Sequence, residues 1–89
     1  EERKAALVLS QSLKIGKELI ENGERDSKVV IETIKTVLQK EPLARVDYVE
    51  VVDFENIQRV DKIHGETLVA IAVYIGKTRL IDNFIVDVR

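Results

Sequence analysis

Three consecutive residues, Gly76, Lys77 and Thr78, are of the types that bind the phosphates of a nucleotide. In such a loop the backbone amides and the lysine bind the phosphates, and the hydroxyl binds magnesium. The loop also needs a glycine five residues before the Gly-Lys pair and a helix after it. Position 71 is isoleucine within an apolar run, and Thr78 opens a segment rich in strand-forming residues. The sequence therefore predicts that Gly76 and Lys77 form a tight hairpin turn and bind no phosphate.

The other residues that could take part in catalysis or metal binding stand alone. His64 is the only histidine and there is no cysteine, so the chain lacks the usual ligands of a zinc site. We expect His64 to be a solvated loop residue. Ser10 and Ser12 fall within a predicted helix, and Ser27 suits a helix cap better than a nucleophile. We predict no catalytic, cofactor-binding or metal-binding residue in this chain.

Three polar residues, Arg79, Asp82 and Asn83, interrupt an otherwise apolar strand-like segment near the end of the chain. Asp and Asn are poor strand formers and bond readily to nearby backbone. One interpretation is therefore a β-bulge or a solvent-exposed edge. The other is that these side chains face another domain across the sheet, and the sequence leaves both open.

Composition limits the classes of function. The 89 residues form one domain, residues 1–89, and carry 14 basic and 16 acidic side chains with interleaved signs. Without a basic patch or clustered aromatic residues, nucleic-acid binding is disfavoured. No apolar stretch reaches the roughly 20 residues of a membrane helix, and the absence of cysteine fits the cytoplasm. A helical pattern begins at once, without methionine or a capping residue, so we expect a piece of a longer polypeptide.

The first half of the chain has the spacing of two amphipathic helices. Apolar residues recur every three or four positions in residues 1–22, and Gly23 is a typical helix stop. A second helix can start near Asp26 or Ser27 and must end before Pro42. Gly16 lies in the middle of the first helix, which indicates a close approach of the second.

The second half has the pattern of three strands. Residues 45–53 are rich in β-branched side chains, and residues 68–75 are an unbroken apolar run, as in a central strand buried on both faces. Residues 78–88 return after the Gly-Lys turn. The sequence thus predicts an α+β domain of order α-α-β-β-β, with two helices packed on a small, mainly antiparallel three-stranded sheet.

The stretch YVEVVDFENIQRVDKIHGETLVAIAVYIGKTRLIDNF, residues 48–84, resembles the C-terminal domain of the pantothenate synthetase (pantoate–β-alanine ligase) family. Members of that family carry a Tyr-Val-Glu-Val-Val-Asp-like strand, an apolar Leu-Val-Ala-Ile-Ala-Val-like strand and a Gly-x-Thr-Arg-Leu-Ile-Asp-Asn hairpin, in this order. The leading EERKAALVLSQSLK is similar to the helix after the family's Met-Ser-Ser-Arg-Asn region. Phe54 departs from the proline or alanine often found there, which affects the turn.

The resemblance implies an ATP-dependent ligase of pantothenate and coenzyme A biosynthesis. In the family, pantoate attacks the α-phosphate of ATP to give pantoyl adenylate, and β-alanine then displaces AMP. ATP and magnesium are implied for the whole enzyme, at a site formed by an N-terminal nucleotide-binding domain and the Met-Ser-Ser-Arg-Asn segment. Neither of these motifs occurs in this chain.

The family's C-terminal domain is a lid that closes over the nucleotide site and excludes water. We therefore expect a lid fragment that neither ligates nor binds ATP by itself and whose partner is the N-terminal domain of the same polypeptide. Arg79, Asp82 and Asn83 are the candidates for the interdomain face. The alternative is a free-standing interaction or ligand-sensing module, which would need a polar groove or a self-complementary sheet edge, whereas a severed lid is expected to be monomeric.

Overall fold

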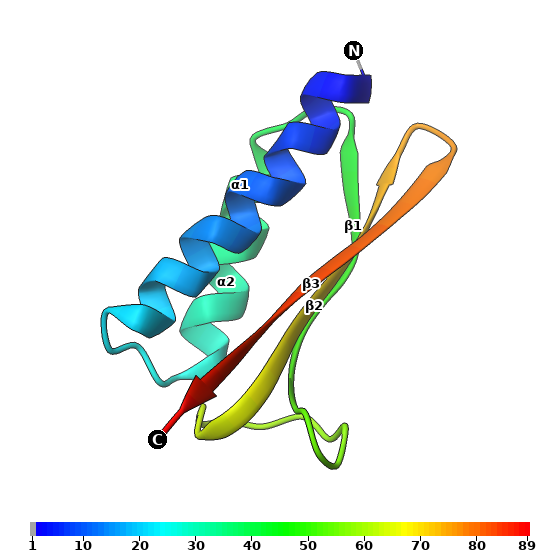
Figure 1. The fold of residues 1–89 in the computed structure, drawn as a ribbon. Helices are drawn as coiled ribbons and strands as arrows, with labels where there is room; N and C mark the ends of the chain where they lie inside the picture. The colour runs from blue at the N-terminus through cyan, green and yellow to red at the C-terminus, as the bar shows by residue number, and fades with distance from the viewer. Residues whose placement is uncertain (1) are drawn as a thin grey trace.

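The computed structural model describes residues 2–89, which form two helices followed by three strands (Figure 1). The helices are α1, Glu2–Glu21, and α2, Ser27–Gln39. The strands are β1, Ala44–Asp53, β2, Gly65–Ile75, and β3, Thr78–Val88. This confirms the predicted order of elements, although the predicted start of the first helix at Glu1 lies outside the described residues. Neither described helix is long and apolar enough to span a membrane.

The three strands form one antiparallel sheet in the order β1-β2-β3. Ile75 pairs with Thr78, so only Gly76 and Lys77 lie in the turn between β2 and β3. Gly76 has a φ of 62°, as the first central residue of a tight hairpin turn requires. The Gly-Lys-Thr sequence is therefore a hairpin turn followed by a strand, as predicted, and no helix begins at Thr78.

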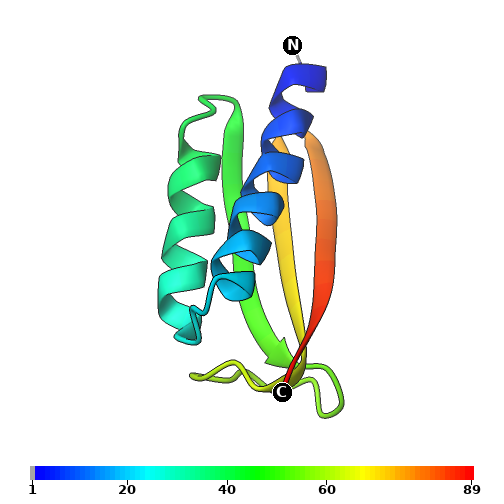
Figure 2. The same ribbon diagram turned by 60° about the vertical axis from the view of Figure 1, so that its left-hand side comes forward.

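Both helices lie on one face of the sheet, so the domain has two layers (Figure 2). α2 lies against β1, while α1 lies against β3 and β2. The core forms between the layers from side chains that point from each strand toward the helices, and Val69, Ile71 and Val73 at its centre are fully buried. Apolar side chains that alternate along the strands and recur along the helices thus meet in a single core.

β2 is central, as predicted, but the prediction that it is buried on both faces is only half right. Its other face carries the half-buried Leu68, Ala70 and Tyr74 and the buried Ala72, and no described element covers this face. An unbroken apolar run usually indicates cover on both sides. In this chain the neighbouring strands shield part of that second face.

The helix ends follow their sequence signals. Asp26 caps α2, and its side chain accepts a hydrogen bond from the amide of Lys28 at 3.0 Å. Gly23 ends α1 with a φ of 112°, a conformation that strains any residue with a Cβ atom. The amide of Glu24 then bonds the carbonyl of Leu19 at 2.9 Å, which satisfies one of the last helical carbonyls.

Gly16 sets how closely α1 and α2 approach, as its position in the sequence predicts. A Cβ atom at Gly16 would lie 2.7 Å from Cδ1 and 2.9 Å from Cγ1 of Ile34, a fully buried residue of α2. Such distances are well inside van der Waals contact. The two helices therefore pack at this point only because residue 16 has no side chain.

The connection from β1 to β2 is tied closely to the rest of the domain. The amide of Val60 bonds the carbonyl of Val51 at 3.2 Å, and the amide of Asp53 bonds the carbonyl of Gln58 at 2.8 Å, so this segment runs beside the outer edge of β1. The amide of Ile63 bonds the carbonyl of Arg25 at 2.8 Å, and its side chain is buried in the core. The connection is thus an ordered part of the fold.

Candidate interdomain face and adjoining groove

The face of the sheet that points away from the helices, here called the open face, gathers polar and apolar side chains from all three strands. Its members follow from the strand register, in which alternate residues share a face. They are Arg45, Tyr48, Glu50 and Val52 of β1, Glu66, Leu68, Ala70, Ala72 and Tyr74 of β2, and Arg79, Ile81, Asn83, Ile85 and Asp87 of β3.

An irregularity in β1 decides which of its residues reach the open face. The register shifts between Val46 and Tyr48, so that Asp47 is an extra residue with no opposing partner. Tyr48 and Glu50 consequently join Arg45 on the open face, and Val49 turns into the core. Without this shift Tyr48 and Glu50 would lie under the helices, and Val49 and Val51 would lie on the open face.

Arg79 connects β3 to β1 across the open face. Its Nε and Nη2 donate to Oδ2 of Asp47 at 3.1 and 2.9 Å, and its guanidinium lies 5.8 Å from the centre of the Tyr48 ring. The hydrogen bond to Asp47 raises the pKa of Arg79 above its usual value, so its charge is fixed. A second arginine, Arg45, lies 5.0 Å from the centre of the Tyr74 ring. These contacts hold both cations flat over the open face.

The three residues predicted for an interdomain face do not share one side of the sheet. Arg79 and Asn83 lie on the open face, opposite Tyr74 and Ala70, whereas Asp82 lies opposite Ile71 and its side chain is on the helical side. Asp82 is nonetheless tied to its neighbour, because its Oδ1 accepts a hydrogen bond from the amide of Asn83 at 2.8 Å. The structure therefore places two of the three side chains on the same face of the sheet, with Ile81 between them.

The open face also exposes large apolar side chains. Ile81 and Ile85 lie on either side of Asn83 along β3, and their exposed fractions are 58% and 46%. Ile85 lies opposite the half-buried Leu68 of the central strand, and Ile81 lies opposite the buried Ala72. Exposed aliphatic side chains that share one face of a sheet are typical of a surface that contacts another protein surface.

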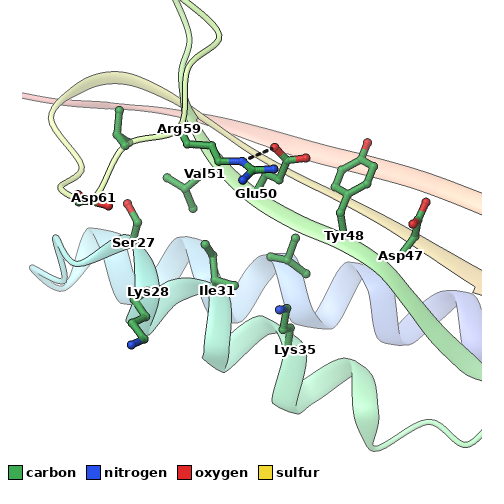
Figure 3. Close-up of a pocket in the computed structure, with 12 residues that line it drawn as sticks. Ser27, Lys28, Ile31, Lys35, Asp47, Tyr48, Glu50, Val51, Arg59 and Asp61 are labelled. Atoms are coloured by element: carbon green, nitrogen blue, oxygen red, sulfur yellow. Dashed lines mark hydrogen bonds and ion pairs between the residues drawn. The ribbon is translucent and has the colours of Figure 1, made fainter.

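A groove of about 490 Å³ runs between α2 and the outer edge of β1 (Figure 3). Its charges are balanced: α2 contributes Lys28 and Lys35, β1 contributes Asp47 and Glu50, and Arg59 bonds Glu50 at 3.3 Å. Such a balance favours neither an anionic nor a cationic ligand. Its full lining is Ser27, Lys28, Ile31, Lys35, Asp47, Tyr48, Val49, Glu50, Val51, Arg59, Val60 and Asp61.

Ser27, at the first turn of α2, lines one end of this groove. Its amide bonds the carbonyl of Asp61 at 3.0 Å, while its Oγ is buried without a hydrogen-bond partner in the described residues. The predicted capping role belongs to the preceding residue, because Asp26 and not Ser27 occupies the N-cap position. Among the described residues, the Oγ of Ser27 is the only buried side-chain oxygen that has no hydrogen-bond partner.

The remaining candidates from the sequence lie apart from one another. His64 is an exposed residue of the β1–β2 connection, as predicted. Ser12 is buried in α1, where its Oγ donates to the carbonyl of Leu9 at 2.8 Å. Within residues 2–89, no three His, Asp or Glu side chains converge as the ligands of a metal ion.

Sequence reasoning missed the groove and the residues that fix Arg79. The signal for the bulge was present, because Val46 and Val49 are both apolar yet lie an odd number of positions apart. If side chains alternate strictly between the two faces, Val46 and Val49 cannot both point into the core. The alternation must therefore shift by one residue between them. The position of Arg79 over the Tyr48 ring depends on that change and could not be predicted without it.

Comparisons with known proteins agree with this fold. A family model described as pantoate–β-alanine ligase matches residues 1–85. The pantothenate synthetase of Clostridium botulinum (strain Langeland) is 55% identical over 84 residues, which are 94% of this chain and 30% of that protein. The pantothenate synthetase of Enterococcus faecalis is 53% identical over 89 residues, which are 100% of this chain and 32% of that protein.

A solved structure gives the same result. The crystal structure of pantothenate synthetase from Thermus thermophilus superposes with a TM-score of 0.85 and 26% identity, over 94% of this chain and 30% of that one. The fold is therefore shared with a segment of that enzyme, and this chain spans about 30% of the length of the relatives it matches. Since the family model covers nearly all of its residues, the chain belongs to the pantoate–β-alanine ligase family.

Proposed function

We propose that this chain acts as the C-terminal lid of a pantothenate synthetase, an ATP-dependent ligase that joins pantoate and β-alanine through a pantoyl adenylate. In this role it closes over a nucleotide-binding domain of the same polypeptide and keeps water from the adenylate. The proposal covers the cytoplasmic whole enzyme, with ATP and magnesium held outside this segment.

The observation that carries the proposal is the family match over residues 1–85 together with the sheet face that no described element covers. An antiparallel sheet commonly leaves one face to solvent, and that face is then mostly polar. The open face combines exposed Ile81 and Ile85 with fixed cations at Arg45 and Arg79. Apolar contact supplies attraction toward another domain, and the arginines form part of the polar surround of that contact.

The described residues do not themselves assemble the chemistry of ligation. Adenylate formation needs amide donors, cations and magnesium around the phosphates of ATP. The two arginines of the open face are engaged with Asp47 and with tyrosine rings, and the acidic residues form no cluster of metal ligands within residues 2–89. The lid thus contributes position and exclusion of water, and the reacting groups belong to the rest of the enzyme.

The interdomain contact is assigned to the open face around Arg79 and Asn83. Asp82 contributes through the amide of Asn83 and not by pointing its side chain at the other domain. In the full-length ligase that carries this segment, alanine at Arg79 or Asn83 is expected to lower the rate more than alanine at Asp82. If all three variants work at the rate of the unchanged enzyme, the interdomain contact does not lie around Arg79 and Asn83.

The experiment that tests the lid role in this chain itself is a calorimetric titration with ATP and magnesium. The purified domain is expected to give no heat of binding up to millimolar ATP, because the groups that bind phosphate are not assembled in it. Saturation with a micromolar Kd, about −8 kcal/mol, would contradict the proposal. That result would instead support the alternative of a free-standing ligand-sensing module, with the groove between α2 and β1 as its site.

A further inference from the structure

β3 is the unprotected edge of the sheet. The sheet order leaves β1 and β3 at its two margins. The outer side of β1 is covered near its end by the connection to β2, where Val60 bonds Val51 and Arg59 bridges Val52. β3 has no strand on its outer side in the described part of the chain, along all 11 of its residues (Figure 2). The backbone N–H and C=O groups along this edge can therefore form hydrogen bonds with another strand.

The hairpin turn determines which residues of β3 present those groups. In a two-residue hairpin the closing pair, Ile75 and Thr78, is hydrogen-bonded, and such pairs recur at every second residue. The even-numbered residues of β3 therefore bond β2, and the odd-numbered ones direct their N–H and C=O groups outward. Asn83 agrees with this assignment, because its amide donates to Oδ1 of Asp82 and not to β2.

The outward-bonding residues form a self-complementary series. They are Arg79, Ile81, Asn83, Ile85 and Asp87, and all five side chains lie on the open face. When a second copy of the strand runs antiparallel with Asn83 on the two-fold axis, each arginine lies opposite an aspartate and each Ile81 lies opposite an Ile85. The same register sets Thr78 opposite Val88, so the two strands overlap over their whole length.

We propose that the outer edge of β3 is an interface for a second copy of this chain, paired antiparallel about Asn83 into one continuous six-stranded sheet. Five hydrogen-bonded residue pairs form, each with two backbone hydrogen bonds. The exposed Ile81 and Ile85 bury each other across the junction, and the two Arg79–Asp87 pairs close its ends. An isologous two-fold contact of this kind closes on itself and gives a dimer.

The charge pattern points to a second copy and fixes the register. A shift by two residues in one direction sets Arg79 opposite Ile85, and in the other direction it sets Arg79 opposite Arg89 and Ile81 opposite Asp87. Both shifts place an isoleucine against a polar side chain, and one also opposes like charges. Only the register centred on Asn83 sets arginine opposite aspartate, isoleucine opposite isoleucine and asparagine opposite asparagine at all five positions.

Existing contacts of these residues limit the strength of the pairing. Asp82 occupies the amide of Asn83 at the centre of the edge and must release it, and an inward charge on an edge strand disfavours pairing. Arg79 reaches inward across β2 to bond Asp47 through Nε and Nη2, so it must release this carboxylate and turn outward to pair with Asp87 of the second copy. Asp87 already forms an exposed ion pair with Arg89 at 3.0 Å. It must give up this pair, or bond both arginines, when it meets Arg79 of the second copy. The dimer is therefore expected to be weak and reversible.

Sedimentation equilibrium of the purified chain tests the interface. A monomer–dimer equilibrium is expected at concentrations up to about 1 mM, and Asp82→Thr, which frees the Asn83 amide, is expected to strengthen it. Asp87→Arg opposes like charges at both ends and is expected to weaken association on the order of tenfold. Arg79→Asp combined with Asp87→Arg is expected to restore it. Glu55→Arg, the same charge change at an exposed loop residue, is the control.

Two outcomes of this experiment overturn the proposal. The first is that the unchanged chain and Asp82→Thr both stay monomeric at about 1 mM, where a millimolar Kd would already show. The second is a dimer that Asp87→Arg weakens no more than Glu55→Arg does. The lid role is tested separately, by the titration with ATP and magnesium: a monomeric chain agrees with that role, whereas a self-complementary sheet edge is the feature expected of the alternative, free-standing module.

A disulfide tests the register directly. The chain has no cysteine, so Asn83→Cys introduces a single thiol on the proposed two-fold axis. Opposed residues of a hydrogen-bonded pair have Cα atoms about 5.5 Å apart, within the range that a disulfide spans. Mild oxidation is expected to link Asn83→Cys into dimers much faster than the exposed control Glu55→Cys. Equal rates for the two variants would overturn the register.

Discussion

Replacing Gly16 with alanine is expected to destabilise the domain, although the change improves helix propensity. In an exposed helix the gain would be about 1 kcal/mol. At this site the new Cβ atom would lie 2.7 Å from Cδ1 of Ile34, whose side chain is fully buried and cannot turn away freely. Forcing a methyl group into a filled core costs about 1–3 kcal/mol, so the net loss is expected to reach about 2 kcal/mol.

Ile34→Val provides the matching change, because it removes Cδ1, the nearer of the two Ile34 atoms that the new Cβ atom meets, and leaves Cγ1 with room to shift. Alone it is expected to cost about 0.5–1.5 kcal/mol, the usual result of shortening a buried isoleucine. In the double variant the alanine methyl fills much of the space that valine leaves. The double variant is therefore expected to be more stable than the sum of the single changes by about 1 kcal/mol.

Urea denaturation followed by circular dichroism measures all four free energies of unfolding in this cycle. Gly23→Ala serves as the control: it is strained by its φ of 112° but meets no atom within 4 Å, so it should show no coupling to Ile34→Val. Additive effects of Gly16→Ala and Ile34→Val would refute the reasoning. So would a Gly16→Ala variant that is more stable by the full propensity gain, since the helices would then not be in contact there.

Two local predictions follow from single residues. Asp26→Ala removes the oxygen that caps α2 and is expected to lower the free energy of unfolding by about 1 kcal/mol. Asp26→Asn keeps an acceptor and should lose far less stability. Equal losses in the two variants would show that the cap contributes little. Ile57 has a φ of 55° and is 63% exposed, so Ile57→Asn removes left-handed strain at little cost in burial and is expected to raise stability by up to about 1 kcal/mol. A lower melting temperature for Ile57→Asn would contradict this account of the loop.

Much of the fold could be predicted because the residues that favour a local structure, such as a helix end or a turn, are also those that the packing of the domain requires. Gly23 and Asp26 end one helix and begin the next whatever lies around them. The turn at Gly76 and Lys77 is fixed by two residues, and it sets the register of the entire β2–β3 hairpin. Gly16 is the most informative case, because a glycine in the middle of a helix has a cost that only a close neighbour explains.

The features that were not predicted depend on contacts between distant segments. The bulge at Asp47 brings that carboxylate to Arg79, 32 residues later, and neither residue alone indicates the pair. The apolar run of β2 predicts burial on both faces, but of its outward side chains Leu68, Ala70 and Tyr74 are only partly shielded by β1 and β3. Asp82 was grouped with Arg79 and Asn83 by proximity in the sequence, whereas a strand sends neighbouring side chains to opposite faces.

The central claim is that the open face docks onto the rest of the ligase and excludes water from the adenylate. Ile81→Asp places a charge in that contact, and Ile57→Asp places the same charge on an equally exposed isoleucine in the β1–β2 connection. Burying Ile81 against another domain is worth roughly 1.5–3 kcal/mol, so its loss should leave the lid open far more often.

The measurement is the ratio of AMP released to pantothenate formed by the full-length ligase at nanomolar enzyme, where weak pairing of β3 edges is absent. A closed lid keeps this ratio near one, because each adenylate is captured by β-alanine before water reaches it. Ile81→Asp is predicted to raise the ratio several-fold, while Ile57→Asp leaves it unchanged. A ratio that stays near one in the Ile81→Asp enzyme would contradict the account.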